Sequence, residues 1–182
     1  FSFCTNLTSI IISDSVTNIG EAAFSGCNSL TSITVAKGNT VFHDDGNCLI
    51  ETASKTLVVG FKHSVIPVDG SVTNIGNHAF YGCKSLASII IPKSTKNIEQ
   101  YAFCLCTNLS QVTCHATEPP ICEIKVFEQV PRLSCKLIVP EESVEAYMAA
   151  NEWRGFYTAD GIEGFEDESI VVNADDQSGS LQ

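Results

Sequence analysis

Apolar and polar residues alternate along several short segments of this chain, and these segments return at a regular interval. In the first of them, Leu7, Ile10 and Ile12 are predicted to point inward, as in a strand with one buried face. Counterparts of this segment begin at Leu30, Leu86 and Leu109. We expect the apolar positions of successive segments to stack on one another in a common interior.

A phrase of the form A-F-x-G-C-x-x-L leads into the later strands. It occurs at residues 23–30 and 79–86 and, in weaker form, at 102–109. Phe1 and Phe24 are 23 residues apart, and so are Phe80 and Phe103. A period in this range is typical of a solenoid, in which each unit is too small to bury its own apolar face.

Each unit also holds a second extended segment, which is residues 15–20 in the first copy. Val16 and Ile19 are expected to point inward from a wall opposite the first strand. The segment recurs at residues 71–76 and, less faithfully, at 94–99. Residues 21–24 then predict a short helical turn, and Gly26 suits the bend that returns the chain to the next strand.

One unit is longer than the others, because 56 residues instead of 23 separate its Phe from the next one. The extra length falls within residues 36–70. There Asp45-Gly46 lies between two apolar runs and is a strong signal for a hairpin turn. We expect two additional strands that continue the stack, so residues 1–115 are predicted to form one repeat domain.

Residues 116–157 are predicted to be a C-terminal capping segment. Pro119 and Pro120 interrupt the repeat, because proline cannot donate a hydrogen bond to a strand ladder. Residues 137–140 are expected to add one strand, and residues 141–151 to form a helix.

The predicted helix has an apolar side made of Val144, Tyr147 and Met148. We expect this side, with Trp153 and Phe156, to close the open end of the core, because terminal repeats need a cap.

The net charge of −11 is concentrated near the C-terminus. Residues 1–115 hold six Lys and seven acidic residues, whereas residues 116–182 hold four basic and fourteen acidic residues. The repeats offer no basic stripe for a phosphate backbone, so we expect neither a nucleic-acid nor an anionic-membrane partner. Residues 158–182 are predicted to be an acidic tail or linker, although Ile170-Val171-Val172 leaves a further strand as an alternative.

Composition adds two expectations. Only 17% of the 182 residues are charged, while 44% are hydrophobic, and no apolar run reaches the roughly 18 residues of a membrane span. The chain also begins inside a repeat without an initiator Met, so we expect it to be a piece of a longer protein.

The spacing of the nine cysteines does not favour a simple disulfide framework. Four of them hold the same position in successive repeats: Cys4, Cys27, Cys83 and Cys106. We expect these four to fill the core as small apolar groups. A bridge of Cys114 or Cys122 to Cys135 is left open by the sequence.

The repeat unit L-x-x-I-x-I-P-x-S-V-T-x-I-G-x-x-A-F-x-G-C-x-x-L resembles the BspA-like class of leucine-rich repeats. Residues 71–76 and 79–92 carry the motif, and residues 139–153 resemble a closing segment common in such proteins of the Bacteroidetes. The resemblance covers about residues 1–157. It departs at residues 94–99, and at Leu105, where Gly is expected.

The resemblance implies a right-handed leucine-rich-repeat solenoid, rich in β-strands with short helical turns and closed by a C-terminal helical cap. It further implies a secreted or surface-anchored bacterial protein that binds other proteins, in some cases for adhesion to host matrix components. The family offers no catalytic residues to carry over.

The concave face expected of such a solenoid is the candidate binding surface. Its outward positions are Ser9, Ile11, Ser32, Thr34, Ser88, Ile90, Gln111 and Thr113. None is charged, and the set lacks the nucleophile, base or paired carboxylates of an enzyme. We therefore predict a non-catalytic protein–protein interaction module without cofactors, with a host extracellular or surface protein as the expected kind of partner.

Three alternatives stay open at this point. The chain could be a structural spacer that presents another domain, or its strand face could be a plain sheet surface. It could also bind glycans through exposed aromatic residues, for which the candidates are Phe42, Phe61, Tyr81 and Tyr101. No metal is expected, because His43-Asp44-Asp45 with nearby Glu51 offers too few ligands for a cage.

Overall fold

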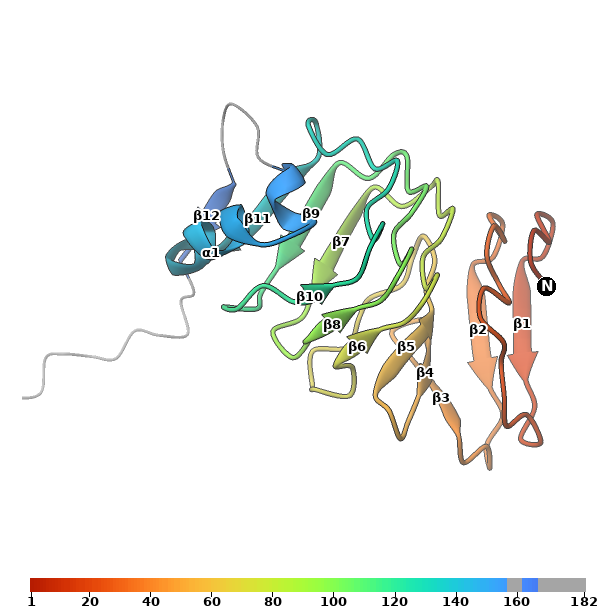
Figure 1. Cartoon of the computed structure of the whole chain (residues 1–182). Helices are drawn as coiled ribbons and strands as arrows, with labels where there is room; N and C mark the ends of the chain where they lie inside the picture. Colours follow the sequence, from red (N-terminus) through yellow and green to blue (C-terminus); the bar gives the residue numbers. More distant parts are fainter. Residues whose placement is uncertain (157–161, 167–182) are drawn as a thin grey trace, which may run out of the picture.

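The computed structural model describes residues 1–156 and 162–166. The chain forms a β-solenoid of about 7 turns with a short C-terminal helix, as the resemblance implied. Its strands build two walls that face each other across a common core (Figure 1).

The first wall holds β1 (Ser9–Ile12), β2 (Ser32–Val35), β7 (Ser88–Ile91), β9 (Gln111–Cys114), β11 (Lys136–Pro140) and β12 (Glu163–Phe165). The alternating pattern predicted β1, β2, β7 and β9, while β11 is the strand expected in the cap and β12 was not predicted. β1 and β2 form one parallel pair, and β7, β9, β11 and β12 form a separate parallel sheet in that order. We call the outer side of this wall the strand face.

The second wall is a single six-stranded sheet. Its members, in chain order, are β3 (Phe42–Asp45), β4 (Cys48–Glu51), β5 (Thr56–Val59), β6 (Asn74–Ile75), β8 (Asn97–Ile98) and β10 (Ile121–Cys122). β3, β4 and β5 pair antiparallel, and the other pairs are parallel. The hairpin turn at Asp45-Gly46 is confirmed, but the long unit has three strands instead of two, because the run that follows the turn folds back twice.

Phenylalanine rings stack between the walls in the later turns. Phe80 and Phe103 have ring centroids 5.1 Å apart, and Phe103 and Phe127 lie 5.5 Å apart, with interplanar angles of 12° and 6°. All three rings are almost fully buried. Offset-stacked rings of this kind gain about 0.5–1.5 kcal/mol per pair beyond their area burial.

The corners that carry these rings are single hydrogen-bonded turns with left-handed residues on both sides of the Phe. His78, Tyr101 and Lys125 precede the ring by two residues with φ of 59°, 60° and 63°. The residue two positions after the ring is Gly82 at 69° or Leu105 at 63°. Leu105 therefore keeps the conformation of the Gly it replaces, and its N–H donates to Glu128 O over 2.9 Å.

Glu99 and Glu123 stand where the repeat has the glycine that follows Ile, as in Gly76. The Glu99 carboxylate accepts the N–H of Asn77 in the preceding turn over 2.9 Å, and Glu123 accepts the N–H of Gln100 at the same distance. The two units that carry Glu at this position therefore each add a hydrogen bond from a side chain to the backbone of the preceding turn.

All nine thiols are free. Three of the four repeat cysteines are buried as predicted, but Cys4, in the first turn described, is exposed. These thiols also bond between turns, since Cys27 donates to Phe1 O over 3.1 Å and Cys106 to Phe80 O over 3.2 Å.

The helical cap consists of a 3₁₀ turn (Glu141–Ser143), helix α1 (Val144–Ala149) and a second 3₁₀ turn (Trp153–Phe156). Tyr147, Trp153 and Phe156 are buried, but Met148 is 41% exposed, so its predicted core position is wrong. A helix of six residues turns only one narrow side to the core. Tyr147 fills that side, and its hydroxyl donates to Ala116 O over 2.7 Å.

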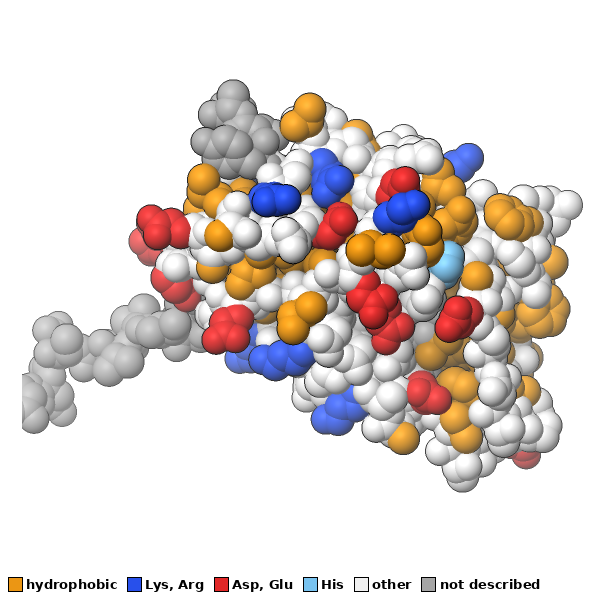
Figure 2. All heavy atoms as spheres, viewed as in Figure 1, with side chains coloured by type: hydrophobic (Ala, Val, Ile, Leu, Met, Phe, Trp, Pro, Cys, Tyr) orange, Lys and Arg blue, Asp and Glu red, His pale blue; other side chains and the backbone are white. Residues whose placement is uncertain are grey.

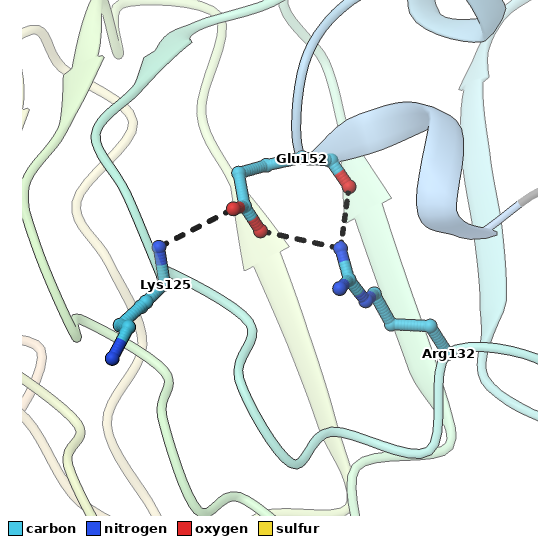
Figure 3. A network of polar contacts seen from close by, with 3 residues as sticks. All are labelled: Lys125, Arg132 and Glu152. Atoms are coloured by element: carbon cyan, nitrogen blue, oxygen red, sulfur yellow. Dashed lines mark hydrogen bonds and ion pairs between the residues drawn. The ribbon is translucent and has the colours of Figure 1, made fainter.

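Glu152 fastens this cap to the last regular turn (Figure 3). Arg132 Nη1 donates to both the backbone oxygen of Glu152, over 3.0 Å, and its Oε2, over 3.2 Å. The N–H of Lys125 donates to Oε1 over 3.3 Å. One carboxylate therefore satisfies donors from two neighbouring segments.

The expected tail contains an element that the sequence analysis did not assign. Strand β12 falls within residues 158–182 and pairs with β11, and Lys136 Nζ lies 2.7 Å from a Glu163 carboxylate oxygen. The alternative strand at Ile170-Val171-Val172 lies outside the described residues.

Candidate binding surface

The strand face carries all eight residues that the sequence predicted to point outward. Ile11 is 75% exposed and Ile90 is 53% exposed, while their neighbours Ile12 and Ile91 are buried. The polar members are exposed in β1, β2 and β7 and half-buried in β9: Ser9, Ser32, Thr34, Ser88, Gln111 and Thr113. The alternation of inward and outward positions is therefore confirmed.

Strand pairing arranges these residues in rows. Ser9 lies opposite Ser32, and Ile11 lies opposite Thr34. In the other sheet, Ser88 and Ile90 lie opposite Gln111 and Thr113 in the same way. Each row places the outward side chains of adjacent strands about 4.8 Å apart.

The two halves of the predicted surface belong to separate sheets. Where a further strand would pair with β2, side chains of the β3–β4 hairpin bond its backbone instead. The N–H of Val35 donates to Asp44 Oδ1 over 2.7 Å, and Asn47 Nδ2 donates to Thr31 O over 2.9 Å. The candidate site is thus two strips joined by a side-chain bridge and not one continuous sheet.

Val65 lies at this junction and was missed by the sequence analysis. It is 66% exposed, while the next residue, Ile66, is 3% exposed, as in the Ile90-Ile91 pair. The Val65 N–H donates to Gly46 O over 2.7 Å, which fixes it beside the hairpin turn. The signal was available, because Val65-Ile66-Pro67 repeats the pattern of Ile90-Ile91-Pro92.

The metal-capable residues of the hairpin make protein contacts. His43 Nδ1 lies 2.8 Å from Thr52 Oγ1, Asp44 bonds β2, and Glu51 accepts from Ser54. Within the described parts of the chain, no three His, Cys, Asp or Glu side chains converge as metal ligands would.

Burial keeps the core thiols protonated. It raises the pKa of Cys48 to about 12 and those of Cys83 and Cys114 to about 11. Since the thiolate is the reactive form, these groups are poor nucleophiles near neutral pH. They act as packing and as weak donors.

Two of the four aromatic candidates are not exposed. Phe42 and Phe61 are each 4% exposed, because the long unit folds their rings into the core. Tyr81 and Tyr101 are half-buried and flank His78, whose ring centroid is 4.9 Å from Tyr81 and 5.0 Å from Tyr101. His78 was not anticipated, because nothing in the sequence brings it between two tyrosines of different turns.

Acidic and basic side chains are interspersed on the face shown in Figure 2, and no continuous basic stripe crosses it. Among the helices that the structure describes, none has the length and apolar character needed to cross a bilayer.

Stacked turns with two strand walls and a Leu-, Ile- and Phe-filled interior define a leucine-rich-repeat solenoid. The chain belongs to the BspA type leucine rich repeat family, whose repeat matches residues 1–52 and 60–145 in 6 copies. A comparison with curated proteins finds no match.

Solved structures with a similar chain path come from bacterial proteins. A leucine rich cell surface protein from Faecalibacterium prausnitzii is 22% identical, with a TM-score of 0.52 over 90% of this chain and 49% of that one. A leucine-rich repeat protein from Eubacterium ventriosum is 20% identical, with a TM-score of 0.45 over 75% and 43%. The pneumococcal vaccine antigen PcpA is 12% identical, with a TM-score of 0.47 over 88% and 56%.

At these identities the likeness concerns the fold alone. The chain spans about half the length of the first two of these structures.

Proposed function

We propose that this chain is a protein-binding module of a secreted or cell-surface bacterial protein, and that it binds with its strand face. The observation that carries the proposal is the presence of exposed apolar side chains among Ser and Thr, with Ile11 and Ile90 on that face and Val65 at its junction. The cell-surface description of the F. prausnitzii protein supports the location. The partner is a protein, for which a host extracellular or matrix protein is the candidate class.

The chemistry of the face suits protein recognition. Burying a Val or Ile side chain in an interface gains about 1.5–3 kcal/mol, and the surrounding hydroxyls can bond a partner at low desolvation cost. None of the eight predicted residues is charged, so electrostatic steering is weak and the association rate should depend little on salt.

A binding screen against host extracellular proteins tests this proposal. The chain is immobilised, and binding is measured by surface plasmon resonance for the wild type and for an Ile11→Asp, Ile90→Asp double variant. We expect saturable binding that the double variant loses. Ile121→Asp is the matched control, because Ile121 is 72% exposed on the opposite wall, in β10.

The same screen separates the proposal from its alternative. Binding that survives in the double variant would place the contact elsewhere on the molecule. No binding at concentrations up to about 100 μM, equivalent to roughly 5.5 kcal/mol, would favour a spacer that presents another domain.

A further inference from the structure

A pocket of about 170 Å³ opens where the long unit meets the regular turns. Its walls come from the corners around Phe24 and Phe80 and from the segment that follows β5. Those two corners touch through a hydrogen bond from Gly26 N to Tyr81 O, 3.3 Å long. The pocket lies at a corner of the solenoid, so it is distinct from the strand face.

The rim of this pocket is polar and carries both signs of charge. Glu21 and Glu99 contribute carboxylates, Lys62 an ammonium group, and Asn28 and Ser85 neutral polar groups. A rim with donors and acceptors and one more carboxylate than ammonium group suits a neutral ligand with many hydroxyls better than an anion.

Aromatic rings border the pocket on one side. Tyr81 and His78 line it and lie ring to ring at 4.9 Å, and Tyr101 extends this row by a further 5.0 Å. Burial lowers the pKa of His78, although the nearby charge of Glu21 opposes the shift. Tyr81 and His78 therefore form an uncharged aromatic border of the pocket, while at the far end of the row Lys125 Nζ lies 5.7 Å from the centroid of the Tyr101 ring.

Ser25 supplies an observation independent of this lining. It lines the pocket, is only 5% exposed, and its hydroxyl has no hydrogen-bond partner within the described residues. A buried hydroxyl without a partner costs about 1–3 kcal/mol. A polar ligand in the pocket could supply the missing bond, whereas an apolar side chain of a protein partner could not.

We propose that this pocket, bounded by Ser25, Tyr81 and Glu99, binds one neutral sugar residue of a glycan, with the next residue over the tyrosine–histidine row. An engineered cavity of about 150 Å³ holds a benzene ring. A space of about 170 Å³ with an open mouth therefore accepts one six-membered sugar ring whose substituents reach the polar rim. This site is separate from the proposed protein-binding face, so a failure of either proposal leaves the other unaffected.

Saturation-transfer NMR and calorimetry with methyl glycosides test the site. The probes are the methyl glycosides of glucose, galactose, mannose and N-acetylglucosamine, with N-acetylneuraminic acid as the charged comparison. We expect a neutral sugar to bind with millimolar affinity and Ser25→Ala to weaken it by roughly two- to tenfold, the value of one hydrogen bond. Tyr81→Leu, which removes the ring but keeps an apolar side chain, should weaken it as well.

Thr95→Val is the matched control for Ser25→Ala. Thr95 also has a buried hydroxyl without a partner in the described structure, but it does not line the pocket. Both substitutions remove an unsatisfied group, so both should leave the thermal midpoint unchanged or raise it, and only Ser25→Ala should weaken sugar binding. No neutral sugar bound at about 10 mM, binding of the charged sugar alone, or unchanged affinity in both pocket variants would overturn the proposal.

Discussion

The two ends of the solenoid are built differently, although the sequence repeats in both. From Phe80 onward, successive turns pair strand to strand, and the rings of Phe80, Phe103 and Phe127 form one stack. Between Phe24 and Phe80, side chains of a hairpin take the place of a pairing strand. The regular part supplies stability, and the interrupted part supplies the junction of the strand face and the pocket.

This contrast has a simple physical origin. A regular turn satisfies its backbone groups with the next turn, so its exposed edge is covered as soon as another copy is added. The extra residues of the long unit form strands of the second wall. The first wall therefore has no strand between β2 and β7 in the described structure. Polar side chains then complete the edge of β2, and apolar residues such as Val65 stay at the surface.

The largest expected effect comes from cutting the ring stack. Phe103→Ala should lower the free energy of unfolding by about 3–5 kcal/mol, because Phe103 is fully buried between two rings. Phe24→Ala should cost less, about 2–3 kcal/mol, since among the described residues Phe24 stacks only on Phe1, which is 67% exposed. Urea unfolding followed by tryptophan fluorescence measures both, and equal losses would contradict the contrast between the two regions.

Replacement of the hairpin glycine should have the next largest effect. A Cβ at Gly46 would overlap the carbonyl oxygen of Val65, and its φ of 55° is left-handed. Gly46→Ala should therefore cost about 2–4 kcal/mol.

Gly82→Ala is the matched comparison for this substitution. Gly82 has a φ of 69°, but the nearest atom to an added Cβ is 3.7 Å away, so only the backbone term of about 1 kcal/mol remains. Thermal unfolding of the two variants compares the costs directly, and a Gly82→Ala loss as large as that of Gly46→Ala would contradict this account.

Removal of the Asp44 side-chain bridge to β2 should change amide exchange only near that strand. Asp44→Ala deletes the acceptor of the Val35 N–H and should cost about 1 kcal/mol, because the bond is exposed to solvent. Hydrogen exchange should show faster exchange at Val35 and little change at Ile89 in the regular sheet. Faster exchange throughout both sheets would mean that the bridge supports the whole solenoid and not only β2.

Much of the fold could be predicted from the sequence because the same few positions are buried in every turn. The alternation of Ile10, Ile12 and their counterparts, and the turn at Asp45-Gly46, depend on near neighbours in the chain. The eight outward residues of the strand face followed from the same alternation. Their division into two sheets did not, because it depends on where Asp44 and Asn47 meet a distant strand.

The pocket and the exposure of Met148 in the cap could not be predicted from near neighbours in the chain. The pocket exists because the corners around Phe24 and Phe80 touch, although the two residues are 56 positions apart in the chain. Met148 has the spacing of a core residue, yet the helix is too short to bury it. The left-handed backbone of Tyr101 and Lys125 had no signal either, since neither residue type favours that conformation.

The left-handed corners also provide the smallest effect among these stability predictions, and it is a gain. Gln129 is exposed and has a φ of 61°, at the position held by Leu105 one turn earlier and by Gly82 two turns earlier. Gln129→Gly should raise the free energy of unfolding by about 0.5–1 kcal/mol, because the strain of a left-handed L-residue exceeds the entropy cost of glycine. Ser134→Gly, at another exposed turn residue without positive φ, should lower stability instead. Chemical denaturation resolves these opposite signs, and a loss at Gln129 would show that the regular corners hold their conformation without strain.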